Sequence, residues 1–177
     1  LASSAIDKVD VLLAVDNSQS MADKQALLAL AVPDLVGGLV NPPCLDEAGN
    51  PVEPGPKSPL EACPKGAQRP FDPVLDIHIG VISSSLGAHG ADTCKPTAAR
   101  PSFDDKGHLL ARADPAGQST LPTYQDKRFL AWDPAQELTP PGEADLTEDS
   151  AADPNDQALL PVLADMITGV GQVGCGF

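Results

Sequence analysis

The sequence predicts an α/β fold: one domain of 177 residues built on a doubly wound, mostly parallel sheet. Residues 8–15 are a short, apolar, β-branched run, typical of a strand buried on both faces in the middle of such a sheet. An amphipathic helical stretch follows from about Ser20, and a second apolar run covers residues 74–83. Long proline-bearing stretches between these elements predict many irregular loops.

The first helix is expected to bury one apolar stripe against the sheet. We expect Pro33 to kink or shorten this helix, and the Gly37–Gly38 pair to end it. The residues assigned to the stripe are Met21, Leu27, Leu28, Val32 and Leu35.

Two insertions flank the second strand. Residues 41–73 are too rich in proline for regular structure, and residues 84–128 form a long loop in which 107–112 are expected to make a short hairpin arm. Within the strand between them, we interpret His78 as a packed or edge-facing residue rather than a ligand.

The last third of the chain contains one short strand and one helix. Residues 128–132 predict an edge strand, with Trp132 packed in the core or at its rim. Residues 133–156 read as an acidic surface loop, which could instead recruit Ca²⁺ or a basic partner. A helix from about Leu159, capped by Asn155 and Asp156 and stopped by Gly169, is expected to follow.

The net charge of −14 argues against nucleic-acid binding, because the phosphate backbone would be repelled. Such acidity favours cations or basic partners, although it also serves solubility alone. No stretch is long and apolar enough for a transmembrane segment.

The four cysteines predict disulfide bonds and therefore an exported protein, secreted or on the cell surface. Cys44 and Cys63 flank the first insertion, so a bond between them would close a loop with little core of its own. Cys94 and Cys175 would then form the second bond, which is one of three connectivities. The alternative is four reduced thiols in the cytosol.

Asp16, Ser18 and Ser20 carry the most informative chemistry in the chain. They alternate on the turn after the first strand, where ligands bind in open α/β sheets. One carboxylate and two hydroxyls are hard oxygen donors, which suit Mg²⁺ best here, with Ca²⁺ or Mn²⁺ as alternatives. Helix capping would explain one or two of these residues, but not all three.

Residues 8–21 resemble the opening of the von Willebrand factor A (VWA) domain, whose metal-ion-dependent adhesion site begins with Asp-x-Ser-x-Ser. Residues 76–85 are similar to the next central strand of that family, and residues 169–176 fall where its second metal loop is expected. The resemblance covers about a third of the chain. It implies that Asp16, Ser18 and Ser20 are metal ligands in a binding module that is not an enzyme.

The resemblance also shows what this sequence lacks. The family's second loop usually supplies a threonine, and here the nearest is Thr168, at the expected helix end. The aspartate of the third loop would follow a later strand, so we expect a partial domain, incomplete at its C-terminal side. The remaining half of the domain, or another subunit, would complete it.

These observations favour an exported adhesion module that contacts a protein ligand, by a carboxylate, through a bound divalent cation. Its insertions would lie at the top of the sheet and set partner choice. The alternative is a structural subunit of a cell-surface or extracellular assembly with a vestigial metal site. A hydrolase using Ser18 or Ser83 with His78 or His89 is disfavoured, because no Gly-x-Ser-x-Gly motif is present.

Overall fold

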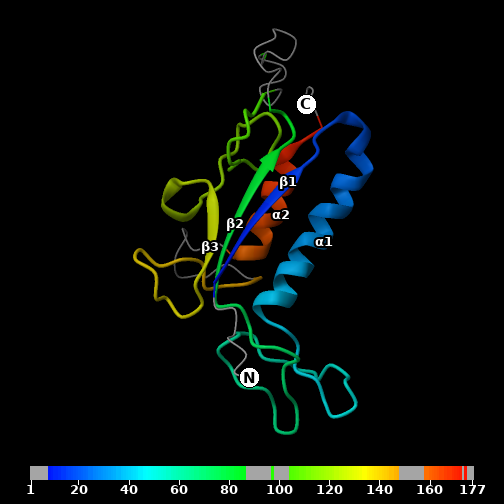
Figure 1. Cartoon of the computed structure of the whole chain (residues 1–177), viewed down its shortest axis with the longest axis vertical. Coiled ribbons are helices and arrows are strands. Elements are labelled where there is room, and N and C mark those ends of the chain that lie inside the picture. The colour runs from blue at the N-terminus through cyan, green and yellow to red at the C-terminus, as the bar shows by residue number, and fades with distance from the viewer. Residues whose placement is uncertain (1–7, 87–96, 98–103, 148–157, 173, 175–177) are drawn as a thin grey trace, which may run out of the picture.

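The computed structural model describes residues 8–86, 97, 104–147, 158–172 and 174. These residues form a small α/β protein whose sheet has the strand order β1-β2-β3 (Figure 1). Strands β1 and β2 run parallel, and β3 pairs antiparallel with β2, so the described sheet is mixed. The strands are β1 (Lys8–Val15), β2 (Asp76–Ser83) and β3 (Phe129–Trp132).

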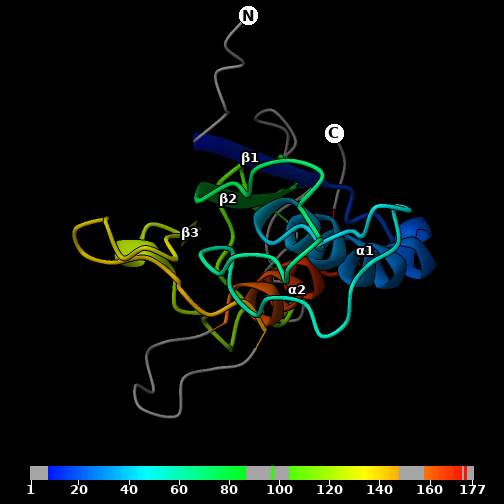
Figure 2. The same ribbon diagram turned by 90° about the horizontal axis from the view of Figure 1, so that it is seen from below.

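Two helices, α1 (Ala22–Val40) and α2 (Leu159–Val170), pack together on one face of the sheet (Figure 2). Short 3-10 turns, η1 (Gln19–Met21) and η4 (Tyr124–Asp126), precede α1 and β3. The predicted α/β class is confirmed. A doubly wound sheet would also carry helices on its other face, and the described residues place none there.

The hydrophobic core lies between the sheet and the two helices. Strand β2 contributes side chains from its central positions, and α2 contributes almost its whole inner face. Trp132 is 1% exposed, so of the two predicted positions, core or rim, it occupies the core. The fully buried large residues of the core include Ile77, Ile79, Val81, Leu130, Leu159, Leu163, Met166 and Ile167.

The predicted bounds of the first strand are confirmed, but its predicted burial is wrong. Among the described residues β1 has only β2 as a neighbour, so it lies at the edge of the sheet. Its side chains alternate between the helix-covered face and the opposite face, where Leu12 is 61% exposed. Apolar composition alone could not reveal this alternation, because both faces of the strand carry apolar residues.

The predicted stripe of α1 is also partly wrong. The helix buries Val32, Val36 and Val40, whereas Leu27 and Leu35 are 67% and 63% exposed. The helix also continues past Pro33 and both predicted stop glycines to Val40. Tertiary packing explains the continuation: three buried valines outweigh the local preference to stop. A Cβ on Gly37 would lie only 3.2 Å from Leu160 Cδ1, so this glycine allows α1 and α2 to approach closely.

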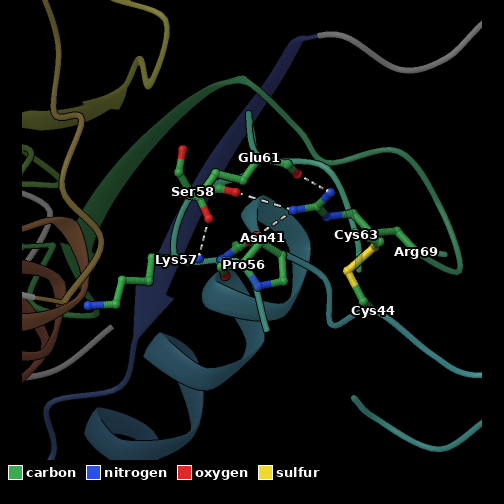
Figure 3. The surroundings of a disulfide bond; sticks show 8 residues. All are labelled: Asn41, Cys44, Pro56, Lys57, Ser58, Glu61, Cys63 and Arg69. Atoms are coloured by element: carbon green, nitrogen blue, oxygen red, sulfur yellow. Dashed lines mark hydrogen bonds between the residues drawn. A yellow bond between two sulfur atoms is a disulfide. The ribbon is translucent and has the colours of Figure 1, made fainter. Parts of the chain in front are cut away.

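The first insertion is irregular, as predicted, and is closed by the Cys44–Cys63 disulfide (Figure 3). Arg69 crosses the loop and donates to the backbone oxygens of Glu61, at 2.8 Å, and Ser58, at 3.2 Å. The insertion lies at the amino ends of the strands, so its predicted place at the top of the sheet is wrong (Figure 1). The insertion lies there because α1 runs antiparallel to β1, so the chain leaves α1 at the amino end of β2.

The remaining predicted elements are close to the observed ones. The predicted edge strand is β3, and the predicted last helix is α2. This helix continues past the predicted stop at Gly169 to Val170, and its C-cap is Gly171, with φ 74°. Its expected caps, Asn155 and Asp156, lie outside the described residues. The expected arm at 107–112 forms only an isolated bridge between Arg112 and Thr120.

The acidic loop does not begin as a solvated segment. Asp133 is buried, and its carboxylate accepts hydrogen bonds from the backbone N–H groups of Glu137, Leu138 and Gly142 at 2.8, 2.9 and 3.2 Å. This carboxylate organises the turn after β3 and is not available to a cation or a basic partner. Residues 148–157 of the same loop lie outside the described residues.

Candidate cation site at the carboxyl ends of β1 and β2

The loop after β1 brings the three predicted metal ligands together. Ser18 donates to Asp16 Oδ1 through both its hydroxyl, at 2.6 Å, and its backbone N–H, at 2.9 Å. The hydroxyl of Ser20 lies 3.5 Å from that of Ser18. Gln25, at the start of α1, donates to the backbone oxygen of Asp16 at 2.8 Å and fixes the loop against the helix.

A fourth oxygen, which the sequence analysis did not assign, comes from the neighbouring strand. The Ser84 hydroxyl lies 3.2 Å from Asp16 Oδ1 and 3.1 Å from Asn17 Oδ1. The parallel register pairs Val15 with Ser83, so the first residues beyond the two strands are also adjacent. The run of serines at the end of the second strand indicated a possible oxygen ligand, but only the register between the strands shows that Ser84 is the one beside Asp16.

The spacing of these oxygens suits a small divalent cation. An octahedral Mg²⁺ site has metal–oxygen distances of about 2.1 Å, which place neighbouring ligand oxygens about 2.9 Å apart. The oxygen–oxygen distances are 2.6 Å for Asp16–Ser18, 3.2 Å for Asp16–Ser84 and 3.5 Å for Ser18–Ser20. These three distances lie near the spacing of neighbouring ligands in such a shell.

The Asp16 carboxylate is held in its charged form. The Ser18 hydroxyl, the Ser18 backbone N–H and the Ser84 hydroxyl lower the pKa of Asp16 below its ordinary 3.8, against the opposing effect of burial. Because the pKa of Asp16 is lower in the folded chain than in the unfolded chain, the ionised carboxylate stabilises the fold at pH values above its unfolded pKa. This stabilisation is lost as the pH falls through the lower pKa of the folded chain. Asp16 is therefore ionised at neutral pH, so its carboxylate carries the charge that a cation needs.

The end of α2 reaches the same place. Gly174 donates its N–H to the Asn17 backbone oxygen at 2.9 Å, and a Cβ at Gly174 would overlap the Asn17 side chain. Residues 169–176 were predicted to form the second metal loop, and their described part does lie beside the first loop. Thr168 supplies no ligand there, since its hydroxyl donates to Ala164 O at 2.9 Å.

Asn17 is fully buried beneath the loop. Its Oδ1 accepts hydrogen bonds from the hydroxyls of Ser84, at 3.1 Å, and Ser85, at 3.0 Å. Its Nδ2 has no partner among the described residues. The hydrogen bonds to its Oδ1 tie the β1 loop to the β2 loop, and no sequence pattern predicted them.

A buried ion pair supports the β2 loop from behind. Arg112 makes two hydrogen bonds to Asp105, at 2.6 and 3.0 Å, and its Nε donates to the Gly169 oxygen at 2.7 Å. Asp105 also accepts the Ser83 hydroxyl at 2.6 Å. Both charged residues come from the second insertion, where sequence reasoning found no pattern to identify them.

The residues considered for hydrolysis do not come together. The Ser83 hydroxyl is bonded to Asp105 on the helix side of the sheet, whereas His78 lies on the opposite face, with Nδ1 2.9 Å from Asp10 and its ring 5.2 Å from Phe129. His78 therefore packs between Asp10 of β1 and Phe129 of β3 on the central strand, so of the two predicted alternatives, packed or edge-facing, the first is confirmed. His89, Cys94 and Cys175 lie outside the described residues.

Within the described ranges, no three His, Cys, Asp or Glu side chains gather as a metal site, so the candidate depends on its hydroxyl groups. In the same part of the chain, neither helix combines the length and hydropathy needed to cross a membrane. Comparison with protein-family models, with curated proteins and with solved structures found no match.

Proposed function

We propose that this chain is part of a VWA-like, doubly wound domain and acts as an exported binding module that holds a divalent cation, with Mg²⁺ favoured over Ca²⁺ or Mn²⁺. The observation that supports this proposal is the convergence of Asp16, Ser18, Ser20 and Ser84 where two parallel strands end. Ligands of open α/β sheets bind beyond the carboxyl ends of the strands, and carboxylate and hydroxyl oxygens are suitable ligands for Mg²⁺.

The composition of the site favours a ligand that carries a carboxylate. One aspartate neutralises only half the charge of a divalent cation, and the three hydroxyls add none. The bound ion would therefore keep a net positive charge and attract an Asp or Glu side chain of a protein partner to its open side. The residues of this chain bind and orient the ion, and the partner's carboxylate completes the shell.

The proposal is a binding role and not an enzymatic one. Nucleic acid is disfavoured as a partner because the chain carries a net charge of −14, which would repel the phosphate groups. The Cys44–Cys63 disulfide fits an extracellular setting, secreted or at the cell surface. The edge position of β1 leaves room for the remaining half of the domain or for another subunit to extend the sheet.

The second candidate is a structural subunit of a cell-surface or extracellular assembly in which the site is vestigial. One observation favours it: three hydrogen bonds from Ser18 and Ser84 already satisfy Asp16 Oδ1 without any cation. A loop that is complete by itself gains less from an ion, because those hydrogen bonds must be given up or reoriented on binding.

We expect Mn²⁺ or Mg²⁺ to raise the melting temperature of the chain. At a metal concentration ten times the dissociation constant, binding adds about 1.4 kcal/mol of stability, which corresponds to a rise of a few degrees. Asp16→Ala should abolish this rise, because it removes the one charged ligand. Differential scanning calorimetry with and without added metal measures the effect, which should also fade as the pH falls through the lowered pKa of Asp16, where the carboxylate becomes protonated.

Asp46→Ala is the matched control. Asp46 also accepts backbone N–H groups, from Ala48 and Asn50 at 2.9 Å, but it lies in the first insertion, at the other end of the sheet. This variant should keep the full metal response. If wild-type protein and Asp16→Ala respond equally, or neither responds, the structural alternative is preferred.

A further inference from the structure

The Asp105–Arg112 ion pair is almost enclosed by protein. The side chains of Asp105 and Arg112 are 7% and 13% exposed, and the carboxylate and guanidinium meet through two hydrogen bonds, at 2.6 and 3.0 Å. This fork-to-fork geometry fixes the orientation of both groups more firmly than a single contact would.

Each member of the pair also holds one of the segments that surround the candidate site. Arg112 donates to the backbone oxygens of Gly169, at 2.7 Å, and Val170, at 3.3 Å, at the C-terminal end of α2. Positive charge there complements both the unpaired carbonyl groups and the helix dipole. The guanidinium therefore fixes the point from which the chain leaves α2 toward Asn17.

Asp105 acts on the loop after β2. It accepts the Ser83 hydroxyl at 2.6 Å, and the same hydroxyl oxygen accepts the Ser85 N–H at 3.2 Å. In return, the Ser85 backbone oxygen accepts the N–H groups of Asp105, at 2.9 Å, and Lys106, at 3.0 Å. Ser84 is thus held between two fixed neighbours, with its own hydroxyl directed at Asp16.

We propose that Asp105, Arg112 and Ser83 are positioning residues that hold Ser84 and Asn17 in the geometry the cation site needs. This inference rests on the proposed function, and it assigns a role to the second insertion: residues 104–112 act as a brace behind the site. The hydrogen bonds of the ion pair go to Ser83, Gly169 and Val170 and not to Asp16. The pair acts through the Ser83–Ser85 turn.

The brace is tested by Mn²⁺ affinity, measured on the full chain by electron paramagnetic resonance of the unbound ion. Ser83→Ala removes the link from Asp105 to the turn, and Arg112→Lys keeps the charge but loses the fork. Both variants should bind Mn²⁺ about tenfold more weakly, as found for residues that orient metal ligands. Affinities equal to that of the wild type would overturn the proposal.

A variant with a purely structural defect provides the control. Val36 is buried near the end of α1 that lies away from the site, so Val36→Ala should lower the melting temperature and leave Mn²⁺ affinity unchanged. If all three variants lose affinity in proportion to their loss of stability, the brace has no specific role and the proposal is wrong.

Failure of the proposed function is distinguished by a readout without metal. If the wild-type chain binds no Mn²⁺, the cation site is wrong, and hydrogen exchange at the amide of Asn17, whose N–H donates to the Ser84 hydroxyl at 3.2 Å, then tests the brace alone. Ser83→Ala should speed this exchange about tenfold, which is the effect of one lost hydrogen bond. Val36→Ala should not speed it when the two variants are compared under conditions of equal global stability. Equal protection in both variants would overturn the brace.

Discussion

Gly169→Ala is expected to destabilise the chain by about 3 kcal/mol, at the upper end of the effects of overpacking. A Cβ at this position would overlap the backbone oxygen of Arg112, and its next neighbours are also backbone atoms, of Arg112 and Ala113. Backbone cannot move aside as a flexible side chain can. Either α2 or the brace must shift, which would also break the Arg112–Gly169 hydrogen bond.

Chemical denaturation of wild type and variant measures this effect, and Gly38→Ala is the matched control. Gly38 lies in α1, also near a helix C-terminus, and a Cβ there would meet no atom within 4 Å. The control should be more stable than the wild type by about 0.5–1 kcal/mol, because alanine favours the helix. Equal responses of the two glycines would show that α2 does not pack on residues 112–113 as described.

Arg112→Met is expected to destabilise the chain by about 3–5 kcal/mol, because it leaves the Asp105 carboxylate buried without its partner. Met fills much of the volume of Arg, so the loss of stability would come from the unpaired carboxylate and not from a cavity. The double variant Arg112→Met with Asp105→Leu removes both charges and should recover most of the lost stability, since apolar pairs often replace buried ion pairs without cost. Urea denaturation of the four proteins of this cycle gives the coupling energy.

The exposed ion pair between Lys8 and Asp76, with a 2.8 Å contact, provides the comparison. The Lys8 side chain is 74% exposed, so Lys8→Met should change stability by less than about 1 kcal/mol. If Arg112→Met were equally mild, the Asp105–Arg112 pair would be solvated, and its proposed role as a brace would lose its physical basis.

The sequence alone was sufficient for the elements whose signals are local. The apolar runs at 8–15 and 74–83 identified β1 and β2, and the periodic leucines after Leu159 identified α2. Alternating oxygen donors directly after a strand also identified the Asp16 loop, because three consecutive alternate positions on one turn necessarily lie close together. The Cys44–Cys63 disulfide was one of three connectivities that the sequence allowed, and the structure confirms this pairing.

Features that depend on distant partners could not be predicted in this way. Leu27 and Leu35 look like core residues by spacing, yet the valines of α1 face the core, because the sheet and α2 together determine which side is covered. Ser84 joins the site only through the register between β1 and β2. Asp105 and Arg112 lie in a segment without periodicity, and their pairing appears only when the end of α2 comes beside them.

The most direct test of the central claim is the location at which a paramagnetic ion binds. On titration of Mn²⁺ into the ¹⁵N-labelled full chain, we predict that the amide signals of Asn17, Ser18, Ser20 and Ser84 broaden first. Signals from Asp46 in the first insertion and from Glu137 after β3 should stay sharp at the same metal concentration. Broadening that begins at those acidic segments, or no selective broadening at all, would contradict a cation site at the ends of β1 and β2.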